Sequence, residues 1–425
     1  MLYDRWRQIA RAHAREPALW DPASDRWWTF AELARAADAA SGSTAPLAFP
    51  QGAGIDFVLT TLRAWREGRV VCPLEPNQPR PEVPPPPTGI AHLKTTSATR
   101  GTPRLVAFRE EQLAADADNI VATMGLRPEW PNLALISLAH SYGFSNLILP
   151  LLLHGIPLIV SDSALPEAVR RRASLVGALT LPAVPALWRA WIDAGTIPTQ
   201  TRLAISAGAP LPLALEQQVF ASAGVKIHNF SGCSESGGIA YDATPTPRTE
   251  SSLAGTPMVN VQLAVGDDAC LEVRGAAVAA TYWPEPAPSL SGGCYRTRDL
   301  AEIRNGRVHL LGRASDIINV AGRKVCPEGV EAVLLRHPDV AECLVLGVPA
   351  GDVREEVVAA VVVPRGRVPA ESLRDHLLAV LPAWQVPREW RFVGQLGANE
   401  RGKLSRAEWR RRFPGINCAS QTPAS

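Results

Sequence analysis

The chain has 425 residues, which is enough for about two to four domains of the usual size. Hydrophobic residues make up 46% and charged residues 20% of the sequence, an ordinary globular balance that excludes global disorder and collagen-like repeats. The 43 basic and 41 acidic residues give a net charge of +2, too small to indicate a nucleic-acid partner or a polybasic membrane contact. We therefore expect a folded protein that recognises its partners locally.

The sequence offers no segment suited to export or to membrane insertion. The longest apolar stretch, 147–160, is broken by two prolines, a histidine and a glycine, and is shorter than the roughly 20 residues of a spanning helix. The first 17 residues carry charges where a signal peptide would be apolar. The seven cysteines form no CxxC pair, so we expect reduced thiols. These features predict a cytoplasmic protein without a transmembrane segment.

The N-terminal part alternates between predicted helices and strands, as layered α/β domains do. Helical spacing of apolar residues predicts helices at 29–40, 55–65 and 110–124. Strands are predicted at 70–74, 90–93, 104–108, 134–137, 158–160, 203–206 and 225–229. Because helical or glycine-containing segments separate these strands, we expect a parallel-rich sheet with helices on both faces.

The pattern changes after about residue 254, where short strands and turns predict an antiparallel or barrel-like part. From residue 325 a compact α+β unit is expected, with helices at 328–336 and 371–380. We place a hinge at Ser315.

The predicted fold is therefore α/β. A large N-terminal domain, 1–313, combines layered sheets and helices with a small β-barrel-like part. A hinge joins it to a small α+β C-terminal domain, 314–425.

Four segments carry groups that could do chemistry, and the first is the loop 95–104. Its ten residues, TTSATRGTPR, hold several hydroxyls, one glycine and two arginines between two predicted strands. Hydroxyls, backbone N–H groups and guanidinium groups all bind phosphate oxygens. The loop is not a Walker loop, because GxxxxGK[ST] is absent and a strand follows. Taken alone, such a loop is more often a plain surface turn.

The second segment, 229–238, places Ser234 beside Glu235 in a glycine-rich turn after a predicted strand. A site in which Mg²⁺ bridges a carboxylate and a nucleotide phosphate needs such an acid. A solvated loop acid is the alternative interpretation.

The third and fourth segments lie further along the chain. Asp299 precedes a predicted hairpin that turns at 305–306 and leads to Arg313. A carboxylate there could accept hydrogen bonds from both ribose hydroxyls, but a charge pair on a hairpin would look the same. The fourth segment, 399–406, presents Lys403 beside a glycine, and only four of the 43 basic residues are lysines. Without context this segment is a charged surface turn.

In this order and at these separations, the four segments resemble the motifs of the adenylate-forming superfamily. That superfamily contains acyl- and aryl-CoA ligases, peptide-synthetase adenylation domains and luciferases. The motifs TSGxTGxPK, YGxTE, YxTGDL, GRxxDxIKxxG and GK resemble residues 96–104, 231–235, 295–300, 312–322 and 402–403. Further similar stretches at 29–33, 64–74, 139–143 and 206–211 extend the resemblance over nearly the whole chain. The early position of the phosphate loop indicates a shortened N-terminal domain.

The chain also departs from the family pattern. Ala98, Arg100 and Arg104 stand where the family usually has Gly, Thr and Lys in the phosphate loop. Ser231 replaces the usual aromatic residue of YGxTE, which leaves Phe230 as the candidate for stacking on adenine. These changes leave a catalytically weakened nucleotide-binding protein open as an alternative.

The resemblance implies a reaction in two steps. A carboxylate attacks the α-phosphate of ATP, with Mg²⁺ bound, to give an acyl-adenylate and pyrophosphate, and a thiol then displaces AMP. The implied catalytic residues are Lys403, which bridges the substrate carboxylate and the α-phosphate, Glu235 as the Mg²⁺ ligand, and Ser234 on phosphate. The implied ATP- and AMP-binding residues are Thr96, Ser97, Thr99, Gly101, Arg104, Gly208, Ala209, Phe230, Ser231, Gly232, Asp299 and Arg313.

The resemblance also implies a rotation of the C-terminal domain between the two steps. This rotation would bring Gly322 towards a thiol channel and Lys324 towards a phosphate of the acceptor, although a turn glycine and a solvated lysine are the alternatives. His140 is implied near the acyl pocket as a gate or substrate contact, with a structural core histidine as the alternative. No acidic residue for a substrate amine stands out, so an amino-acid substrate is not expected.

The sequence thus predicts an ATP-dependent acid–thiol ligase for an aromatic or aliphatic carboxylic acid. The acceptor would be CoA or the phosphopantetheine of an acyl carrier protein. Two alternatives remain: an adenylating enzyme with a non-thiol acceptor, and the weakened nucleotide-binding protein.

Overall fold

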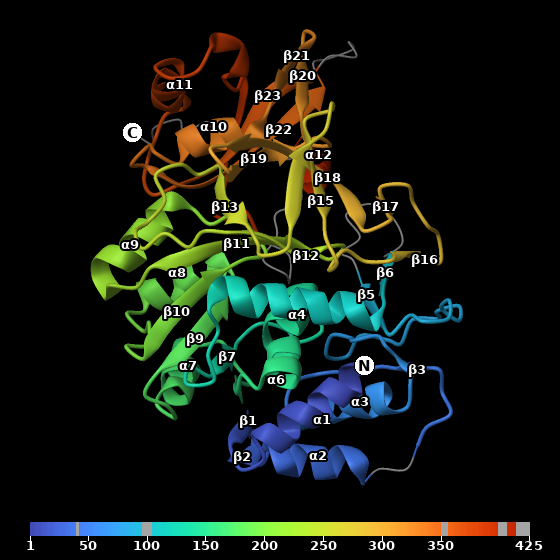
Figure 1. The fold of residues 1–425 in the computed structure, drawn as a ribbon. Coiled ribbons are helices and arrows are strands. Elements are labelled where there is room, and N and C mark those ends of the chain that lie inside the picture. Colours follow the sequence, from blue (N-terminus) through green and yellow to red (C-terminus); the bar gives the residue numbers. More distant parts are fainter. Residues whose placement is uncertain (40–41, 96–103, 350–355, 398–405, 414–425) are drawn as a thin grey trace. The chain divides into compact units, whose positions relative to one another are not determined.

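The computed structural model describes residues 1–425 except 40–41, 96–103, 350–355, 398–405 and 414–425 (Figure 1). The chain divides into two compact units. The first comprises Met1–Ala264, Glu272–Thr297 and Ile303–Val308, and the second comprises Val265–Leu271, Arg298–Glu302 and His309–Ser425. The predicted α/β class, with a large N-terminal part and a smaller C-terminal part, is confirmed. The domain boundary at 313/314 and the hinge at Ser315 stay predictions.

The N-terminal helices follow from apolar spacing and capping. The elements are α1 (Leu2–Ala12), β1 (Pro17–Asp21), β2 (Arg26–Thr29), α2 (Phe30–Asp38) and α3 (Ile55–Arg66). Helix α2 begins with a capping box, because the Thr29 hydroxyl accepts from Glu32 N at 3.2 Å and Glu32 Oε2 accepts from Thr29 N at 2.8 Å. Helices α2 and α3 were predicted. Helix α1 was not, although its buried Leu2, Trp6 and Ala10 have the i, i+4 spacing of a helix face.

A five-stranded sheet frames the predicted phosphate loop. Its order is β16-β6-β5-β4-β3, formed by β3 (Leu47–Ala48), β4 (Val70–Val71), β5 (His92–Thr95), β6 (Leu105–Phe108) and β16 (Thr281–Trp283). Strands β5 and β6 pair antiparallel on either side of residues 96–103. As predicted, this loop joins two strands.

The larger sheet carries the strands predicted at 158–160, 203–206 and 225–229, whereas the strand predicted at 134–137 lies at 132–134 and β9 was not predicted. It contains β7 (Asn132–Ala134), β8 (Leu158–Val160), β9 (Leu179–Ala183), β10 (Thr201–Ser206), β11 (Ile227–Cys233), β12 (Gly237–Tyr241) and β13 (Leu253–Pro257). Part of its order is β13-β12-β11-β10-β9-β7-β8-β1-β2, and the neighbours from β11 to β8 run parallel. The carboxyl ends of these parallel strands therefore share one edge.

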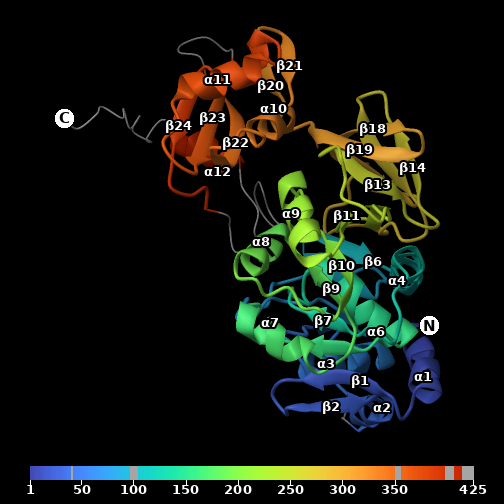
Figure 2. The same cartoon turned by 90° about the vertical axis from the view of Figure 1, so that its left-hand side faces the viewer.

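Helices cover this sheet on both sides. The covering helices include α4 (Glu110–Met124), α7 (Pro166–Ala173), α8 (Pro185–Asp193) and α9 (Leu213–Ala223). Trp188 and Trp191 of α8 are fully buried in one core with side chains of β7, β9 and β10. Figure 2 shows α8 on one side of these strands and α4 on the other. The doubly covered sheet is the one that the alternating sequence predicts.

The long apolar segment after β7 forms one interrupted helix. It consists of α5 (Ser141–Gly143), a π-helical turn η1 (Phe144–Ile148) and α6 (Leu149–His154). All five residues of η1 are buried. Such widened turns are frequent at functional sites, and this one begins four residues after His140.

A hairpin part follows at β14 (Gln262–Val265), β15 (Cys270–Arg274), β17 (Leu290–Ser291), β18 (Cys294–Arg304) and β19 (Arg307–Arg313). Asn305 and Gly306 both have positive φ angles, 51° and 72°, as a two-residue hairpin turn requires. The predicted turn at 305–306 is therefore confirmed.

The remaining elements are those of a small α+β body. They are β20 (Ile318–Val320), β21 (Arg323–Val325), α10 (Pro327–Leu334), β22 (Val340–Pro349), β23 (Glu356–Pro364), α11 (Ala370–Leu378), the 3₁₀ turn η2 (Ala383–Gln385), β24 (Glu389–Phe392) and α12 (Arg406–Arg412). Arg406 holds α12 in place: its guanidinium lies 3.1 Å from Asp316, 2.7 Å from Glu328 and 2.8 Å from Glu331. This half-buried cluster ties the C-terminal helix to α10 and to the segment before β20.

Thiols and membrane-spanning helices can be examined in the described part of the chain. Cysteines 72, 233, 270, 294, 326 and 343 are all free thiols. Within the described residues no helix has both the length and the apolarity to cross a membrane.

His92 makes the stability of the fold depend on pH. Its ring is fully buried in β5, 4.3 Å from the centre of the Phe144 ring, and neither ring nitrogen has a hydrogen-bond partner among the described residues. Burial, helped by the charge of Lys94, lowers the pKa of His92 well below 6.5. The unfolded chain therefore takes up a proton below about pH 6.5 that the folded chain does not.

We expect the free energy of unfolding to fall below pH 6.5, with His92 contributing up to about 1.4 kcal/mol per pH unit. Urea unfolding between pH 7.5 and 5 measures this slope. The variant His92→Leu is expected to show a shallower slope, because it has no proton to take up. Equal slopes for both proteins would contradict the assignment.

Candidate active site

Glu235 lies in the short turn that joins β11 to β12. The prediction ended the preceding strand at residue 229 and placed Ser231 and Gly232 in the turn. That placement is wrong: both residues belong to β11 and pair with Ala240 and Gly238 of β12. Glycines permit this close pairing, because a Cβ at Gly232 would lie 2.8 Å from Gly237 O. The turn is therefore limited to Ser234, Glu235 and Ser236.

The Glu235 carboxylate is held by a tyrosine of another strand. Tyr282 of β16 donates its hydroxyl to Glu235 Oε1 at 3.0 Å, and Glu235 O accepts from Ala279 N at 2.8 Å. Burial raises the pKa of Tyr282 and of its neighbour Tyr295, and the negative charge of Glu235 adds to the rise in both. Both phenols therefore remain protonated at neutral pH.

Arg104 joins this group from the end of the predicted phosphate loop. Its guanidinium carbon lies 5.5 Å from the centre of the Tyr282 ring, at a distance typical of a cation–π contact. One tyrosine thus contacts both the acid of the second predicted segment and the arginine of the first. Of the other candidates in that loop, Thr96, Ser97, Thr99 and Gly101 lie outside the described residues.

The groups around Glu235 fit an Mg²⁺ ion that is bound together with phosphates. Among the described residues no three His, Cys, Asp or Glu side chains cluster closely enough to form a protein-only metal site. Mg²⁺ in nucleotide sites is usually held by one or two carboxylates together with substrate phosphates. A single oriented carboxylate, with Ser234 beside it and an arginine nearby, meets that requirement.

Four further candidates belong to neighbouring strands: Phe230 and Ser231 lie in β11, and Gly208 and Ala209 follow the end of β10. Phe230 is only 7% exposed and its ring centre lies 5.9 Å from that of Tyr142. The Tyr142 hydroxyl donates to Ile205 O at 3.5 Å, just before the segment with Gly208 and Ala209. Ligands of α/β sheets bind at the carboxyl ends of strands. Stacking of Phe230 on adenine stays a prediction, as do the roles of Ser231, Gly208 and Ala209.

His140 belongs to a second polar group. His140 Nε2 lies 2.8 Å from Glu75 Oε1, which also accepts from the Ser137 hydroxyl at 2.7 Å. Gly143 is required here, because a Cβ at this position would lie 1.9 Å from Ser137 O. His140 is thus partly exposed and hydrogen-bonded rather than enclosed in the core.

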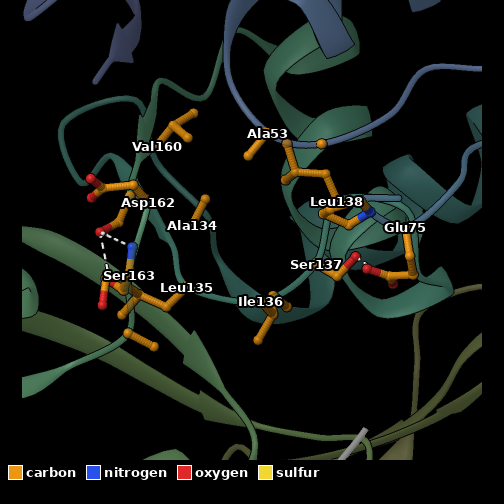
Figure 3. A pocket seen from close by; sticks show the side chains of 14 residues that line it. Ala53, Glu75, Ala134, Leu135, Ile136, Ser137, Leu138, Val160, Asp162 and Ser163 are labelled. Atoms are coloured by element: carbon orange, nitrogen blue, oxygen red, sulfur yellow. Dashed lines mark hydrogen bonds between the residues drawn. The ribbon is translucent and has the colours of Figure 1, made fainter. Parts of the chain in front are cut away.

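Glu75 and Ser137 line a pocket of about 180 Å³ in the first unit. Figure 3 shows these two side chains side by side, with Asp162 and Ser163 at the other end of the pocket. The pocket lies beyond the carboxyl ends of β7 and β8, because the residues that follow both strands line it. Its position is that of a ligand site in a parallel sheet.

The second unit contains the remaining described candidates. Arg313 Nε lies 3.3 Å from Asp299 Oδ1, so the two residues that the resemblance assigns to ribose are neighbours. Gly322 forms the turn between β20 and β21, and a Cβ there would meet nothing within 4 Å. Lys324 is exposed on β21. Ser315 donates its hydroxyl to Asp316 at 3.0 Å, and Lys403 lies outside the described residues.

Two contact residues were missed from the sequence. Tyr282 stands in a short aromatic strand, TYW, that matches no motif and reaches Glu235 only through the fold. Glu75 follows an apolar strand and opens a proline-rich stretch, and the sequence did not single it out as a candidate. A carboxylate directly after a buried strand was the available signal for Glu75, and nothing local marked Tyr282.

Two family models match the chain. The model described as AMP-binding enzyme matches residues 51–283, and the model described as AMP-binding enzyme C-terminal domain matches residues 329–403. A probable 2-succinylbenzoate–CoA ligase of Mycobacterium tuberculosis is 31% identical over 351 residues, which cover 77% of this chain and 85% of the relative. A sulfoacetate–CoA ligase of Cupriavidus necator is 27% identical over 373 residues, which cover 83% and 73%.

Solved structures share the fold. ATP-bound MatB from Rhodopseudomonas palustris has a TM-score of 0.84 at 19% identity, with 98% of this chain and 100% of that chain covered. An o-succinylbenzoate CoA synthetase from Bacillus subtilis, in complex with its acyl-adenylate intermediate, has a TM-score of 0.81 at 20% identity, with 96% and 97% covered. Both family models, the sequence relatives and the shared fold agree with the motifs read from the sequence, and the chain belongs to the AMP-binding, adenylate-forming enzyme family.

Proposed function

We propose that this protein is an ATP-dependent acid–thiol ligase that activates an aromatic or aliphatic carboxylic acid and transfers it to CoA. The observation that carries the proposal is the contact of Tyr282 with both Glu235 and Arg104. An oriented acid and a cation together suit a magnesium–nucleotide complex. The names of the relatives support CoA as the acceptor, since they include 2-succinylbenzoate–CoA, sulfoacetate–CoA and feruloyl-CoA enzymes.

In the first step the acid's carboxylate oxygen would bond to the α-phosphorus of ATP as the bond to pyrophosphate breaks. Charge develops on the phosphate oxygens, so fixed positive groups lower the barrier. Lys403 would supply such a charge between the two reactants, and Arg104 a second one. Bound Mg²⁺ would neutralise phosphate charge, with Glu235 as its protein ligand and Ser234 on a phosphate oxygen.

In the second step the thiol sulfur would bond to the acyl carbon, AMP would leave with its oxygen, and the thiol would lose its proton. The proposed residues for this step are in the second unit. The turn at Gly322 has open space around it, which suits a backbone that approaches a thioester arm closely. Lys324 is exposed and would contact a phosphate of CoA, or of the phosphopantetheine on an acyl carrier protein.

The Asp299–Arg313 pair would hold the ribose of the nucleotide, with Asp299 accepting from its hydroxyls. We propose Ser315 as the hinge between domains 1–313 and 314–425. Its hydroxyl bonds to Asp316, which the Arg406 cluster holds in turn, so the segment after Ser315 has a fixed anchor about which a rotation could occur.

Two alternative functions remain to be distinguished from the acid–thiol ligase. A non-thiol acceptor would use the same first step. A weakened nucleotide-binding protein would follow from the altered loop residues Ala98, Arg100 and Arg104. The presence of Glu235, Asp299, Arg313 and Lys403 together at the positions of the motifs favours catalysis.

We expect the protein to exchange labelled pyrophosphate into ATP only when a suitable acid is present, because the first step is reversible. Benzoates, cinnamates, succinylated aromatic acids and fatty acids are the acids to compare. Adding CoA, or a phosphopantetheinylated carrier protein, should convert the active acid to a thioester detectable by mass spectrometry. A protein that binds ATP yet exchanges with none of these acids would favour the nucleotide-binding alternative.

Lys403→Ala is expected to lower acid-dependent exchange by at least a hundredfold, which is the effect of removing one transition-state contact, about 3 kcal/mol. Thioester formation from supplied acyl-adenylate should persist, since Lys403 acts only in the first step. Arg411→Ala, which removes an exposed charge from α12, is the matched control for loss of a cation. An equal loss of activity in both steps would contradict the proposal that Lys403 acts only in the first step.

Glu75→Gln is expected to raise KM for the acid about tenfold, the equivalent of a charge-assisted hydrogen bond of about 1.5 kcal/mol. The reason is that His140 loses the carboxylate that orients its ring beside the proposed acyl site. KM for ATP should change little. Asp193→Asn, an exposed acid at the end of α8, controls for loss of charge in the same unit. An unchanged KM for the acid would remove His140 from the acyl site.

A further inference from the structure

Lys94 is a buried cation for which the proposed chemistry has no use. Its side chain in β5 is 2% exposed, whereas lysines are almost never buried unless they are paired. The residue stands two positions before the predicted phosphate loop, in a chain with only four lysines. A charge in such a place costs several kcal/mol unless its partners compensate it, so its contacts indicate what it does.

The Lys94 ammonium bonds to two polar side chains from different helices. Its Nζ donates to the Ser145 hydroxyl at 3.1 Å and lies 3.8 Å from Asp116 Oδ2. Ser145 in turn donates to the same Asp116 oxygen at 2.6 Å. All three side chains are at most 3% exposed. The cluster therefore joins β5, α4 and the π-helical turn η1 in an environment where electrostatic contacts are strong.

Asp116 extends this cluster to the backbone beside Glu235. Its second oxygen, Oδ1, accepts from Gly238 N at 3.2 Å. Gly237 has a φ of +68°, and a Cβ there would lie 2.0 Å from the same oxygen. The carboxylate thus packs directly against the first two residues of β12. These residues close the turn that holds Glu235, so the position of Asp116 fixes one end of that turn.

The Lys94 cluster (Lys94, Ser145 and Asp116) consequently connects the ends of three proposed site segments. Strand β5 leads into the phosphate loop, η1 follows His140, and Gly238 follows Glu235. The other ionisable groups close to the ammonium are His92, on the same face of β5, together with Cys233 and Glu235. Without Lys94, the buried Asp116 carboxylate would lose the cation that faces it, and its position against Gly238 would be less well fixed.

We propose that Lys94 is a positioning residue for Glu235, acting through Asp116 and the backbone at Gly238. This inference rests on the proposed function, since it gives the Glu235 turn its role in binding magnesium and ATP. Loss of the Lys94 charge loosens the turn, and a displacement of the order of 1 Å at a catalytic group lowers activity strongly. In this role Lys94 acts on Glu235 only through other residues.

The chain offers a matched control in a second buried lysine. Lys226 is also buried, with 9% of its surface exposed. It forms ion pairs with Glu216 and with Asp242, the latter at 2.8 Å. It stands just before β11 begins, whereas the Glu235 turn follows the other end of that strand. Removing its charge costs stability by the same mechanism, without a contact to the Glu235 turn.

The test compares Lys94→Met and Lys226→Met by urea unfolding and by acid-dependent pyrophosphate exchange at varied Mg²⁺ and ATP. Both variants should unfold at lower urea concentration. Only Lys94→Met is expected to raise the half-saturating Mg²⁺ concentration, by about tenfold, and to lower kcat. If Lys94→Met does not fold, Lys94→Gln, which keeps a donor for Ser145, is expected to change Mg²⁺ dependence in the same direction.

The double variant Lys94→Met/Asp116→Asn tests whether Lys94 acts through Asp116. It leaves no unpaired buried charge and keeps an acceptor for Gly238 N, so it should return the Mg²⁺ dependence most of the way to that of the unmodified protein. An Mg²⁺ dependence equal in Lys94→Met and Lys226→Met would overturn the proposal. If the unmodified protein exchanges with no acid, the proposed function fails, and calorimetric titration with ATP and Mg²⁺ still compares the two lysine variants.

Discussion

The close pairing of β11 with β12 is the constraint on which the first unit's site depends. Gly232 and Gly237 approach to distances that exclude a side chain, and this tight ladder leaves a turn of only three residues. A turn so short has few conformations, so its acid is confined before any ligand binds. The Tyr282 hydroxyl then selects the carboxylate orientation. Preorganised charge of this kind stabilises a transition state better than charge that must be reoriented.

In the proposed mechanism the chemistry is divided between two units, each with its own internally paired polar groups. The first unit orients Glu235 by a neutral hydrogen bond, while the second pairs Asp299 with Arg313 as ions. In the proposed mechanism this hydrogen bond orients the Glu235 carboxylate for Mg²⁺. The exposed Asp299–Arg313 pair, by contrast, is weak in water and can exchange its partner for a ligand hydroxyl at little cost.

Local patterns in the sequence predicted much of the fold and less of the site. Helix α4 and strand β8 were placed to the residue, because periodic burial and flanking turn residues act over short distances. Strand β11 was ended too early, because its glycines read as a turn, although here they serve close strand pairing. Tyr282 and Asp116 reach Glu235 and Gly238 across 47 and 122 residues, and no local pattern encodes contacts at such separation.

The choice between lysine and arginine follows from the number and geometry of the partners. Arg406 serves different partners with its three nitrogens: Nε donates to Val345 O, Nη1 lies close to Asp316 and Glu328, and Nη2 donates to both Glu331 oxygens. The single nitrogen of an ammonium does not present donors over such a span. Lys94, by contrast, places its Nζ among Phe108, Ser145 and Asp116, partners that one compact charge can serve. In a chain whose basic residues are mostly arginines, the lysine at position 94 therefore stands where the partners converge on a single point.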